Sequence, residues 1–220
     1  MVNTWTLITT HNRHDMLGDL LTDVDRDRTV IVDHRSDPPV VQRCAGVIRC
    51  DCAPNISHLW NLGLNRIDTL NRESEGGDVP FNVLVCNDDL RIPAGTIPAL
   101  AAALRAEDAT VAYPDVHALL RPGRTETHNV PGPYNLFTRM TGFCFMLRGE
   151  RGIRADERLV WWYGDDDIEW RAALTGGAVR VGGVTVQHLS PNGSLTDPEL
   201  VAQTARDRET FIEKWNRAPW

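Results

Sequence analysis

Short apolar runs alternate with helical patterns along the first half of the chain, and this alternation is what most limits the possible folds. Strand-length runs occupy residues 5–10, 29–32 and 81–86. Between them, residues 16–24 and 56–67 place apolar side chains at the three- and four-residue spacing of a helix face. Strands that alternate with helices pair in parallel, with the helices covering the sheet. We therefore expect a single-domain α/β fold with a mostly parallel central sheet and helices on both faces.

Polar clusters follow three of these apolar runs at the point where each run ends. They comprise residues 10–12, 33–37 and 87–89. In open parallel sheets, ligands bind outside the carboxyl ends of the strands. The three clusters are therefore expected to share one edge of the sheet and to form a binding site there.

The second half of the chain is less regular. Residues 117–134 are rich in Pro, Gly and Arg and are expected to form a long loop, and the composition of residues 71–80 also predicts a surface loop. A final helix is expected from a capping box at residues 196–199, with Pro198 in its first turn. The remaining expected elements are strands over residues 47–49, 110–113, 141–147 and 179–186 and helices over residues 97–104 and 164–174.

Composition excludes several classes of protein. Of the 220 residues, 42% are hydrophobic and 24% are charged, as in ordinary globular domains. No apolar run approaches the length of a membrane span, and the first residues lack the pattern of a signal peptide, so a cytoplasmic protein is expected. The net charge of −7 argues against a broad nucleic-acid-binding face, which would be basic.

The five cysteines are the least informative of the reactive residues. Cys50-Asp51-Cys52 could form part of a metal clip, but zinc sites usually take two cysteine pairs. Because the protein is expected in the cytoplasm, we predict reduced thiols.

Asn87-Asp88-Asp89 is the strongest local signal in the sequence. Two adjacent carboxylates at the end of a buried strand repel each other and resist desolvation unless a cation lies beside them. A divalent metal held by carboxylates and substrate phosphates is a common arrangement. A solvated acidic turn is an equally good interpretation at this point.

A second acidic run, Gly164-Asp165-Asp166-Asp167, stands at the start of a predicted helix. Aspartate is favoured there as a cap and by the helix dipole. Three aspartates beside Trp161 exceed what a cap requires, and mutual repulsion would raise a pKa as suits a general base. His188 follows a predicted strand and could be either a packed residue or a metal ligand.

The order of these features resembles the inverting, GT-A-fold family 2 glycosyltransferases, whose fold is Rossmann-like. The resemblance extends over nearly the whole chain through short motifs. In the first half, Thr9–Arg13 resembles the family's TYNR turn, residues 30–33 resemble its VVD strand, Asn61-Leu62-Gly63 resembles its N-x-G motif, and residues 84–89 resemble its DxD strand. In the second half, Thr141-Gly142 and Asp156-Glu157 resemble the TG…FDE signals, and residues 164–171 resemble the ED-x-D…R pattern. His188 and Ser194 together resemble the late H…S element.

This resemblance implies a site for each stage of glycosyl transfer. The implied metal ligands for Mn²⁺ or Mg²⁺ are Asp89 and His188. The implied general base is Asp165, although Gly164 stands where the family has Glu, so the choice between Asp165 and Asp166 stays open. The implied contacts to a UDP-, GDP- or dTDP-sugar donor come from Thr10, Asn12, Asp33, Asn61, Asn87 and Asp88.

The resemblance also divides the single domain, residues 1–220. Residues 1–115 would bind the nucleotide-sugar, residues 116–195 would hold the acceptor and the base, and residues 196–220 would form a C-terminal helix. The acceptor could be a glycan, a protein or a modified DNA base. Two other functions stay open: a sugar-nucleotide pyrophosphorylase, although residues 9–13 lack the expected glycine-rich loop, and a non-catalytic nucleotide- or carbohydrate-binding module.

Overall fold

The protein is described by a computed structural model that covers residues 2–75, 79–190 and 197–220. The elements run in chain order as β1 (Asn3–Thr10), α1 (His14–Leu20), η1 (Arg26–Arg28), β2 (Thr29–His34), β3 (Gly46–Cys50), α2 (Ile56–Glu75), β4 (Phe81–Asn87), β5 (Leu90–Arg91), α3 (Thr96–Ala106), β6 (Val111–Pro114), β7 (Thr125–His128), β8 (Cys144–Arg148), η2 (Gly149–Arg151), α4 (Gly164–Leu174), β9 (Ala178–Val181), β10 (Gln187–His188) and α5 (Pro198–Trp215).

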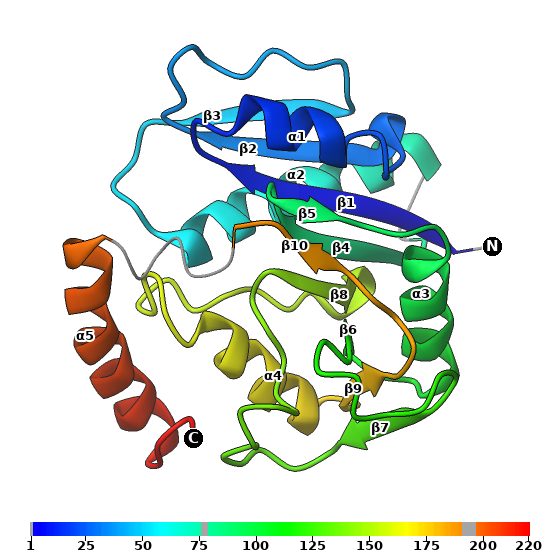
Figure 1. Cartoon of the computed structure of the whole chain (residues 1–220), viewed down its shortest axis with the longest axis vertical. Coiled ribbons are helices and arrows are strands. Elements are labelled where there is room, and N and C mark those ends of the chain that lie inside the picture. Colours follow the sequence, from blue (N-terminus) through cyan, green and yellow to red (C-terminus); the bar gives the residue numbers. More distant parts are fainter. Residues whose placement is uncertain (1, 76–78, 191–196) are drawn as a thin grey trace.

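One sheet organises the molecule, with strand order β3-β2-β1-β4-β8-β6-β9-β7. The first four strands are all parallel, as expected from the alternation of strands and helices. β8 then lies antiparallel between β4 and β6, and β7 lies antiparallel on β9. The sheet is therefore mostly parallel, with its antiparallel pairs confined to the half built by the later strands (Figure 1).

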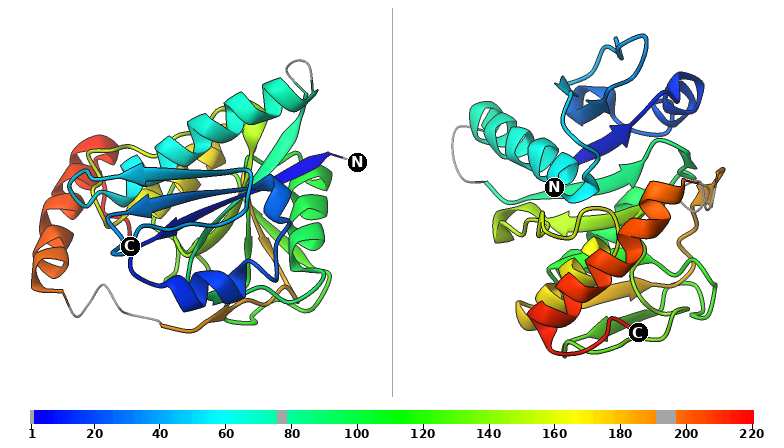
Figure 2. Two further views of the ribbon diagram at one scale, coloured as in Figure 1. Left: turned by 90° about the horizontal axis from the view of Figure 1, so that it is seen from above. Right: turned by 90° about the vertical axis from the view of Figure 1, so that its left-hand side faces the viewer.

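Helices cover both faces of the sheet, and each face has its own apolar core. Figure 2 shows α1 and α2 on opposite sides of the strands. Leu59, Trp60 and Leu64 of α2 pack in one core together with Ile168 of α4. Leu17 of α1 packs in the other core, where α3 also buries its apolar side chains. Strands such as β4 are buried on both faces, which explains why their sequences are mostly apolar and not alternating.

The C-terminal helix α5 lies along the outside of α4 (Figures 1 and 2). Aromatic side chains join the two helices, with Trp170 of α4 edge-to-face against Phe211 and Trp215 of α5. The fully buried carboxylate of Asp207 accepts hydrogen bonds from the backbone N–H groups of residues 160–162. α5 is thereby fixed to the segment that precedes α4. It begins at Pro198 with Asp197 as its N-cap, close to the prediction, although Thr196 lies outside the described residues.

Two predicted loops are only partly correct. Helix α2 continues to Glu75, so residues 71–75 are helical, because Asn71 is buried and its side chain bonds Trp5 and Val79. The long loop at residues 117–134 contains β7, which pairs with the edge of β9. Both differences arise from contacts with residues distant in the sequence, which local composition does not reveal.

The prediction of reduced thiols is wrong for two of the five cysteines. Cys50, at the end of β3, and Cys52, in the turn that follows, form a disulfide, whereas Cys44, Cys86 and Cys144 are free. The turn brings the two α-carbons to 5.4 Å, within the range that a disulfide spans. Across the described parts of the chain, no helix has the length and apolarity that crossing a membrane requires.

Candidate functional site

The parallel strands end at a common edge, as predicted. Thr10 at the end of β1 pairs in register with Asp33 of β2, and Thr9 pairs with Asn87 of β4. A cavity of about 430 Å³ opens at this edge, a size that suits a small-molecule ligand. Its lining comprises Thr9, Thr10, His11, Arg13, His34, Ile56, Leu59, Asn87, Asp88, Asp89, Trp161, His188, Ser190, Asp197 and Leu200.

Two buried carboxylates form the centre of this cavity. Asp88 and Asp89 follow β4 and are 5% and 1% exposed. Thr10 donates its hydroxyl to Asp88 Oδ2 at 2.7 Å. Nη1 of Arg13 lies 2.5 Å from Asp89 Oδ2 and 3.3 Å from Asp88 Oδ1, so one guanidinium bridges the two acids. The acidic pair is therefore a buried site with a cation beside it, and the solvated-turn interpretation does not hold.

The two carboxylates differ in their acidity. Burial raises the pKa of Asp88, and this effect outweighs the opposing contributions of Thr10 and Arg13. Burial also opposes ionisation of Asp89, but His188 and Arg13 more than offset it and hold the pKa of Asp89 below its usual value. Asp89 is therefore the carboxylate more firmly held in the charged form that metal binding needs.

His188 reaches this pair through a short strand pairing. β10 lies antiparallel to β5, with His188 opposite Leu90, and the N–H of Leu189 donates to the carbonyl oxygen of Asp89. Nε2 of His188 consequently lies 3.3 Å from Asp89 Oδ1, and its ring stacks on Phe143. The structure thus joins two residues that are almost a hundred positions apart in the sequence.

The donor atoms at this point suit a divalent cation. Asp89 Oδ1 is buried, and among the residues that the structure describes its polar neighbour is the His188 imidazole, 3.3 Å away and outside good hydrogen-bond geometry. A buried charged oxygen with such weak pairing is costly unless a cation or a better-placed donor satisfies it. Carboxylate oxygen and imidazole nitrogen are ligand types that Mn²⁺ accepts, and Mg²⁺ favours the carboxylate. Asp88, Asp89 and His188 could therefore hold such an ion, in a place where Arg13 now supplies positive charge.

Five of the predicted site residues line the cavity together: Thr10, Asn87, Asp88, Asp89 and His188. Three others, Asn12, Asp33 and Asn61, are not part of its lining. The carboxylate of Asp33 accepts from the backbone N–H groups of Ser36 and Val40 and from Arg49, and these interactions lower its pKa even though burial acts to raise it. The atoms of Asp33 thus hold the loop after β2.

Asn12 and Asn61 also have structural partners. Asn61 accepts from the N–H of Ala155 and donates to the carbonyl oxygen of Ala155 and to Glu157. It thereby fixes α2 to the segment before α4. Asn12 has a positive φ of 55°, a conformation that asparagine tolerates well, and its side chain accepts from the N–H of Asp37. A direct role for either in donor binding stays a prediction.

The second acidic run begins α4, as predicted, and its three members have different surroundings. Asp167 is fully buried and bonds Arg171, Lys214 and Trp215. Asp166 accepts two hydrogen bonds from Nη1 of Arg139, at 3.1 and 2.9 Å. Burial, reinforced by repulsion from Asp165, raises the pKa of Asp166 well above its usual value. Asp165 is the most exposed of the three at 17%, with Arg139 at 3.6 Å.

The segment at residues 141–143 connects the two acidic clusters. The N–H of Asn87 donates to the carbonyl oxygen of Phe143, and Phe143 stacks on His188. The next residue back, Gly142, leaves room for Asp165, since a β-carbon at that position would lie 3.3 Å from Asp165 Oδ2. Asp165 itself is not among the residues that line the cavity. The two clusters therefore lie on either side of one short segment.

Several lining residues were not named as site residues from the sequence. Arg13 and His11 lie in the polar turn after β1, so their position at a strand end was an available signal. His34 ends β2 and carries the same signal. Trp161 and Leu200 carried no such signal, because they reach the cavity through the packing of α5 against the segment before α4. In that packing, Trp162 Nε1 donates to the carbonyl oxygen of Leu200.

Comparisons with known proteins support the fold from an independent direction. No protein-family model matches this sequence, and no curated protein is significantly similar to it. Solved structures of glycosyltransferases do match. TarS of S. aureus, residues 1–349, superposes with a TM-score of 0.59 at 13% identity, over 98% of this chain and 72% of that one. TarS has also been solved with UDP and with UDP-GlcNAc.

Two further structures come from other glycosyltransferases. The mannosyltransferase PcManGT of Pyrobaculum calidifontis, in complex with GDP-Man and Mn²⁺, matches with a TM-score of 0.62 at 12% identity, over 96% of this chain and 64% of that one. GalNAc-T7, with UDP, GalNAc and Mn²⁺, matches with a TM-score of 0.57 at 12% identity, over 86% of this chain and 44% of that one. At such low identity the likeness establishes a shared GT-A-type fold.

Proposed function

We propose that this protein is a glycosyltransferase that moves a sugar from a nucleotide-sugar donor to an acceptor hydroxyl with inversion at the anomeric carbon. The observation that carries the proposal is the buried Asp88–Asp89 pair, which faces a cavity at the strand ends together with His188. Its support comes from the fold, which is shared with glycosyltransferases solved with nucleotide-sugars or nucleotides. A fold hosts many functions, so the residues of the site decide the activity.

The acidic pair would hold the metal. Asp89 offers a buried oxygen, Oδ1, and His188 offers an imidazole nitrogen 3.3 Å from it. A bound Mn²⁺ or Mg²⁺ would supply positive charge that stabilises the diphosphate as the leaving group. Arg13 already lies against both carboxylates, so the side chain must yield part of this contact when an ion binds.

The donor would occupy the cavity at the ends of β1, β2 and β4. Thr10 and Asn87 line this cavity beside Asp88 and are proposed to contact the nucleotide-sugar. Asp33, Asn12 and Asn61 are proposed to contribute through the loops that they hold: Asp33 fixes residues 36–40, and Asn61 fixes residues 155–157. Direct contact of these three with the donor would require their present hydrogen bonds to change.

Asp165 is proposed as the general base. Its carboxylate would accept the proton of the acceptor hydroxyl as that oxygen attacks the anomeric carbon. Asp166 is less suited to this role because it is nearly inaccessible, at 3% exposure, and both its oxygens accept from Arg139. Asp165 keeps 17% exposure, and the absence of a side chain at Gly142 leaves its carboxylate uncovered on that side. No specific observation favours a pyrophosphorylase or a binding module.

Metal-linked nucleotide binding is the first test. UDP, GDP or dTDP with Mn²⁺ should raise the melting temperature, since a ligand that binds only the native state stabilises it by about 2.7 kcal/mol at a hundredfold excess over Kd. Asp89→Ala should abolish this gain. Asp27→Ala removes an exposed carboxylate distant in sequence from β4 and should leave the gain intact. If no nucleotide stabilises the wild-type protein with any divalent ion, the glycosyltransferase proposal fails.

A further inference from the structure

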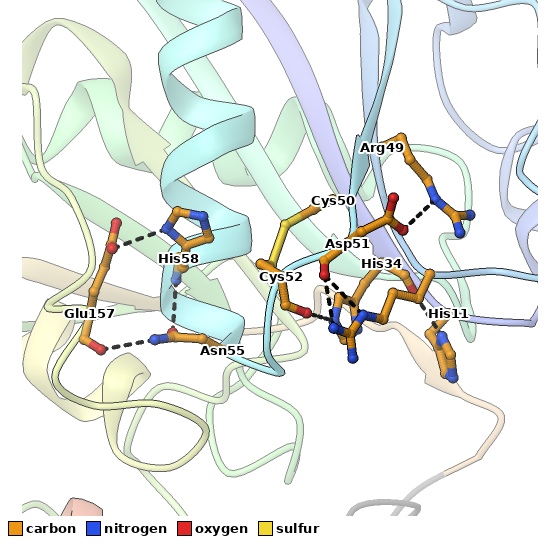
Figure 3. The surroundings of a disulfide bond; sticks show 10 residues. His11, His34, Arg49, Cys50, Asp51, Cys52, Asn55, His58 and Glu157 are labelled. Atoms are coloured by element: carbon orange, nitrogen blue, oxygen red, sulfur yellow. Dashed lines mark hydrogen bonds and ion pairs between the residues drawn. A yellow bond between two sulfur atoms is a disulfide. The ribbon is translucent and has the colours of Figure 1, made fainter.

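Three potential ligands for a soft metal meet where β3 ends and α2 begins. The sulfur atoms of Cys50 and Cys52 and a ring nitrogen of His58 all lie within 4.8 Å of one another. Figure 3 shows the imidazole of His58 between the disulfide and Glu157. None of the three residues lines the cavity at the strand ends. The cluster is therefore separate from the site formed by Asp88, Asp89 and His188.

His58 is held in the orientation that a metal-binding histidine needs. Its Nδ1 lies 3.0 Å from Glu157 Oε2, and because a carboxylate can only accept, Nδ1 carries the proton. This tautomer leaves the lone pair of Nε2 available for a ligand bond. A carboxylate on the far nitrogen is the usual support for a histidine that binds zinc.

Neighbouring hydrogen bonds fix this arrangement. Asn55 accepts from the backbone N–H of His58 at 3.0 Å, and its amide donates to the carbonyl oxygen of Glu157 at 2.9 Å. Asn61, one turn further along α2, donates to the other carboxylate oxygen of Glu157 at 2.8 Å. Glu157 and His58 are thus positioned together by two asparagines of the same helical segment (Figure 3 shows Asn55).

The disulfide contributes little to the stability of the fold, so the protein can stay folded when the two cysteines are reduced. It joins residues separated by two positions, and a bond that closes so short a loop removes little freedom from the unfolded chain. Cys50 is buried, but Cys52 is partly exposed, so a reductant can reach this disulfide from the side of Cys52.

We propose that Cys50, Cys52 and His58 form a second metal site, which takes a thiophilic divalent cation such as Zn²⁺ when the disulfide is reduced. Two thiols of a cellular reductant would give two electrons and two protons to the disulfide and become a disulfide themselves. Binding of the cation would then release the two cysteine protons, because the thiolate is the ligand form. Water would complete four-coordination, as in sites with three protein ligands.

The geometry is close to what such an ion requires. With bonds of about 2.3 Å to sulfur and about 2.0 Å to nitrogen, ligand atoms in a tetrahedral site lie roughly 3.5–3.8 Å apart. Atoms that already lie within 4.8 Å of one another reach these separations through side-chain rotation once the sulfur–sulfur bond is broken. Two thiolates select a soft cation, whereas the oxygen-rich site at Asp88 and Asp89 suits Mn²⁺ or Mg²⁺. The two sites would therefore bind different metals.

Cobalt(II) titration tests the proposal, because thiolate coordination gives Co²⁺ a charge-transfer absorption that oxygen ligands do not. Asp89→Ala protein, in which the acidic site is disabled, is reduced with a phosphine, freed of reductant and titrated without oxygen. We expect one thiolate-bound Co²⁺ per chain, displaced by Zn²⁺, and no such absorption before reduction. Cys52→Ser and Cys50→Ser should each abolish tight binding, and His58→Ala should weaken it at least tenfold.

The matched control is Cys44→Ser, which removes a partly exposed free thiol and should leave the titration unchanged. Circular dichroism of each variant separates loss of a ligand from loss of folding. Failure of the reduced protein to bind Co²⁺ through thiolate would overturn the proposal, as would undiminished binding in folded Cys50→Ser and Cys52→Ser proteins. Because the readout needs neither nucleotide nor sugar, it is independent of the proposed glycosyl transfer.

Discussion

The chain carries two runs of adjacent aspartates, Asp88-Asp89 after β4 and Asp165-Asp166-Asp167 at the start of α4, and their surroundings differ sharply. The first pair faces a cavity, and the guanidinium of Arg13 contacts both carboxylates. In the second run, Asp167 is enclosed by Arg171, Lys214 and Trp215 and serves to hold α5. Similar acidic sequences thus face a cavity in one place and form a structural anchor in the other.

The comparison shows that the partners of each acid, and not the number of acids, decide its role. A carboxylate that is buried and fully paired stabilises the fold and has no free oxygen for chemistry. A carboxylate that faces a cavity with one weakly paired oxygen, such as Asp89, can bind a ligand there. Asp165 stands between these extremes, because it is 17% exposed and its ion pair with Arg139 is long, at 3.6 Å. Variants of individual acids can test each assignment.

The largest expected effect is on turnover in Asp165→Asn. The amide keeps the shape of the side chain but cannot take a proton, and general-base catalysis is worth about 10²- to 10⁴-fold in rate. Turnover should therefore fall by that factor while donor affinity stays close to wild type, measured by steady-state kinetics and by calorimetry. Asp166→Asn should lose less. A normal rate in Asp165→Asn with an inactive Asp166→Asn would transfer the role to Asp166.

The next largest effect is on stability in Asp167→Ala. Removing this carboxylate deprives Arg171 of its fully buried partner and leaves Lys214 paired with Asp156, and breaking a buried pair costs about 3–5 kcal/mol. Urea unfolding monitored by tryptophan fluorescence measures the loss. Asp165→Ala is the matched control, since its side chain is more exposed and should cost less than about 1 kcal/mol. Equal losses in the two variants would contradict the division of roles within α4.

Among Asp88, Asp89 and His188 at the cavity, the histidine is tested next: His188→Ala should raise the Mn²⁺ concentration needed for nucleotide-dependent stabilisation. Removing a residue that hydrogen-bonds a metal ligand typically lowers metal affinity 10- to 100-fold, and removing a direct ligand should lower it at least as much. The measurement is a Mn²⁺ titration of the melting temperature at a fixed nucleotide concentration. His117→Ala removes an exposed histidine and serves as the control. An unchanged Mn²⁺ requirement in His188→Ala would make His188 a packing residue.

The smallest effect is expected for Asp33→Asn, about 1–3 kcal/mol of stability from its buried hydrogen bonds. Because the folded-state pKa of Asp33 is lowered, its stabilisation is present above its unfolded pKa of about 3.9 and is lost as the pH falls through the folded value. The difference in unfolding free energy between wild type and variant should therefore shrink below about pH 4. Unchanged nucleotide affinity in the folded variant would assign Asp33 to structure alone.

The sequence by itself determined the sheet and the edge at which the site lies. Apolar runs and helical spacing are local patterns, so β1, β2, β4 and the exact start of α4 at Gly164 could be read from neighbouring residues. Polar residues that end successive parallel strands must share one edge, which is why Thr10, Asn87, Asp88 and Asp89 were found together. Local patterns do not reveal contacts with distant residues, so β7 and the end of α2, which depend on such contacts, were misassigned.

Only the tertiary structure decided which side chains face one another. The pairing of β10 with β5 sets His188 beside Asp89, and the packing of α5 on α4 encloses Asp167 but leaves Asp165 partly exposed. The turn after β3 and the start of α2 likewise bring Cys50 and Cys52 to His58. Burial, pKa and hydrogen-bond partners are set by all the atoms around a group, including those contributed by remote segments. For that reason the sequence identified the acidic residues, but only the tertiary structure decided which of them face the cavity and which anchor a helix.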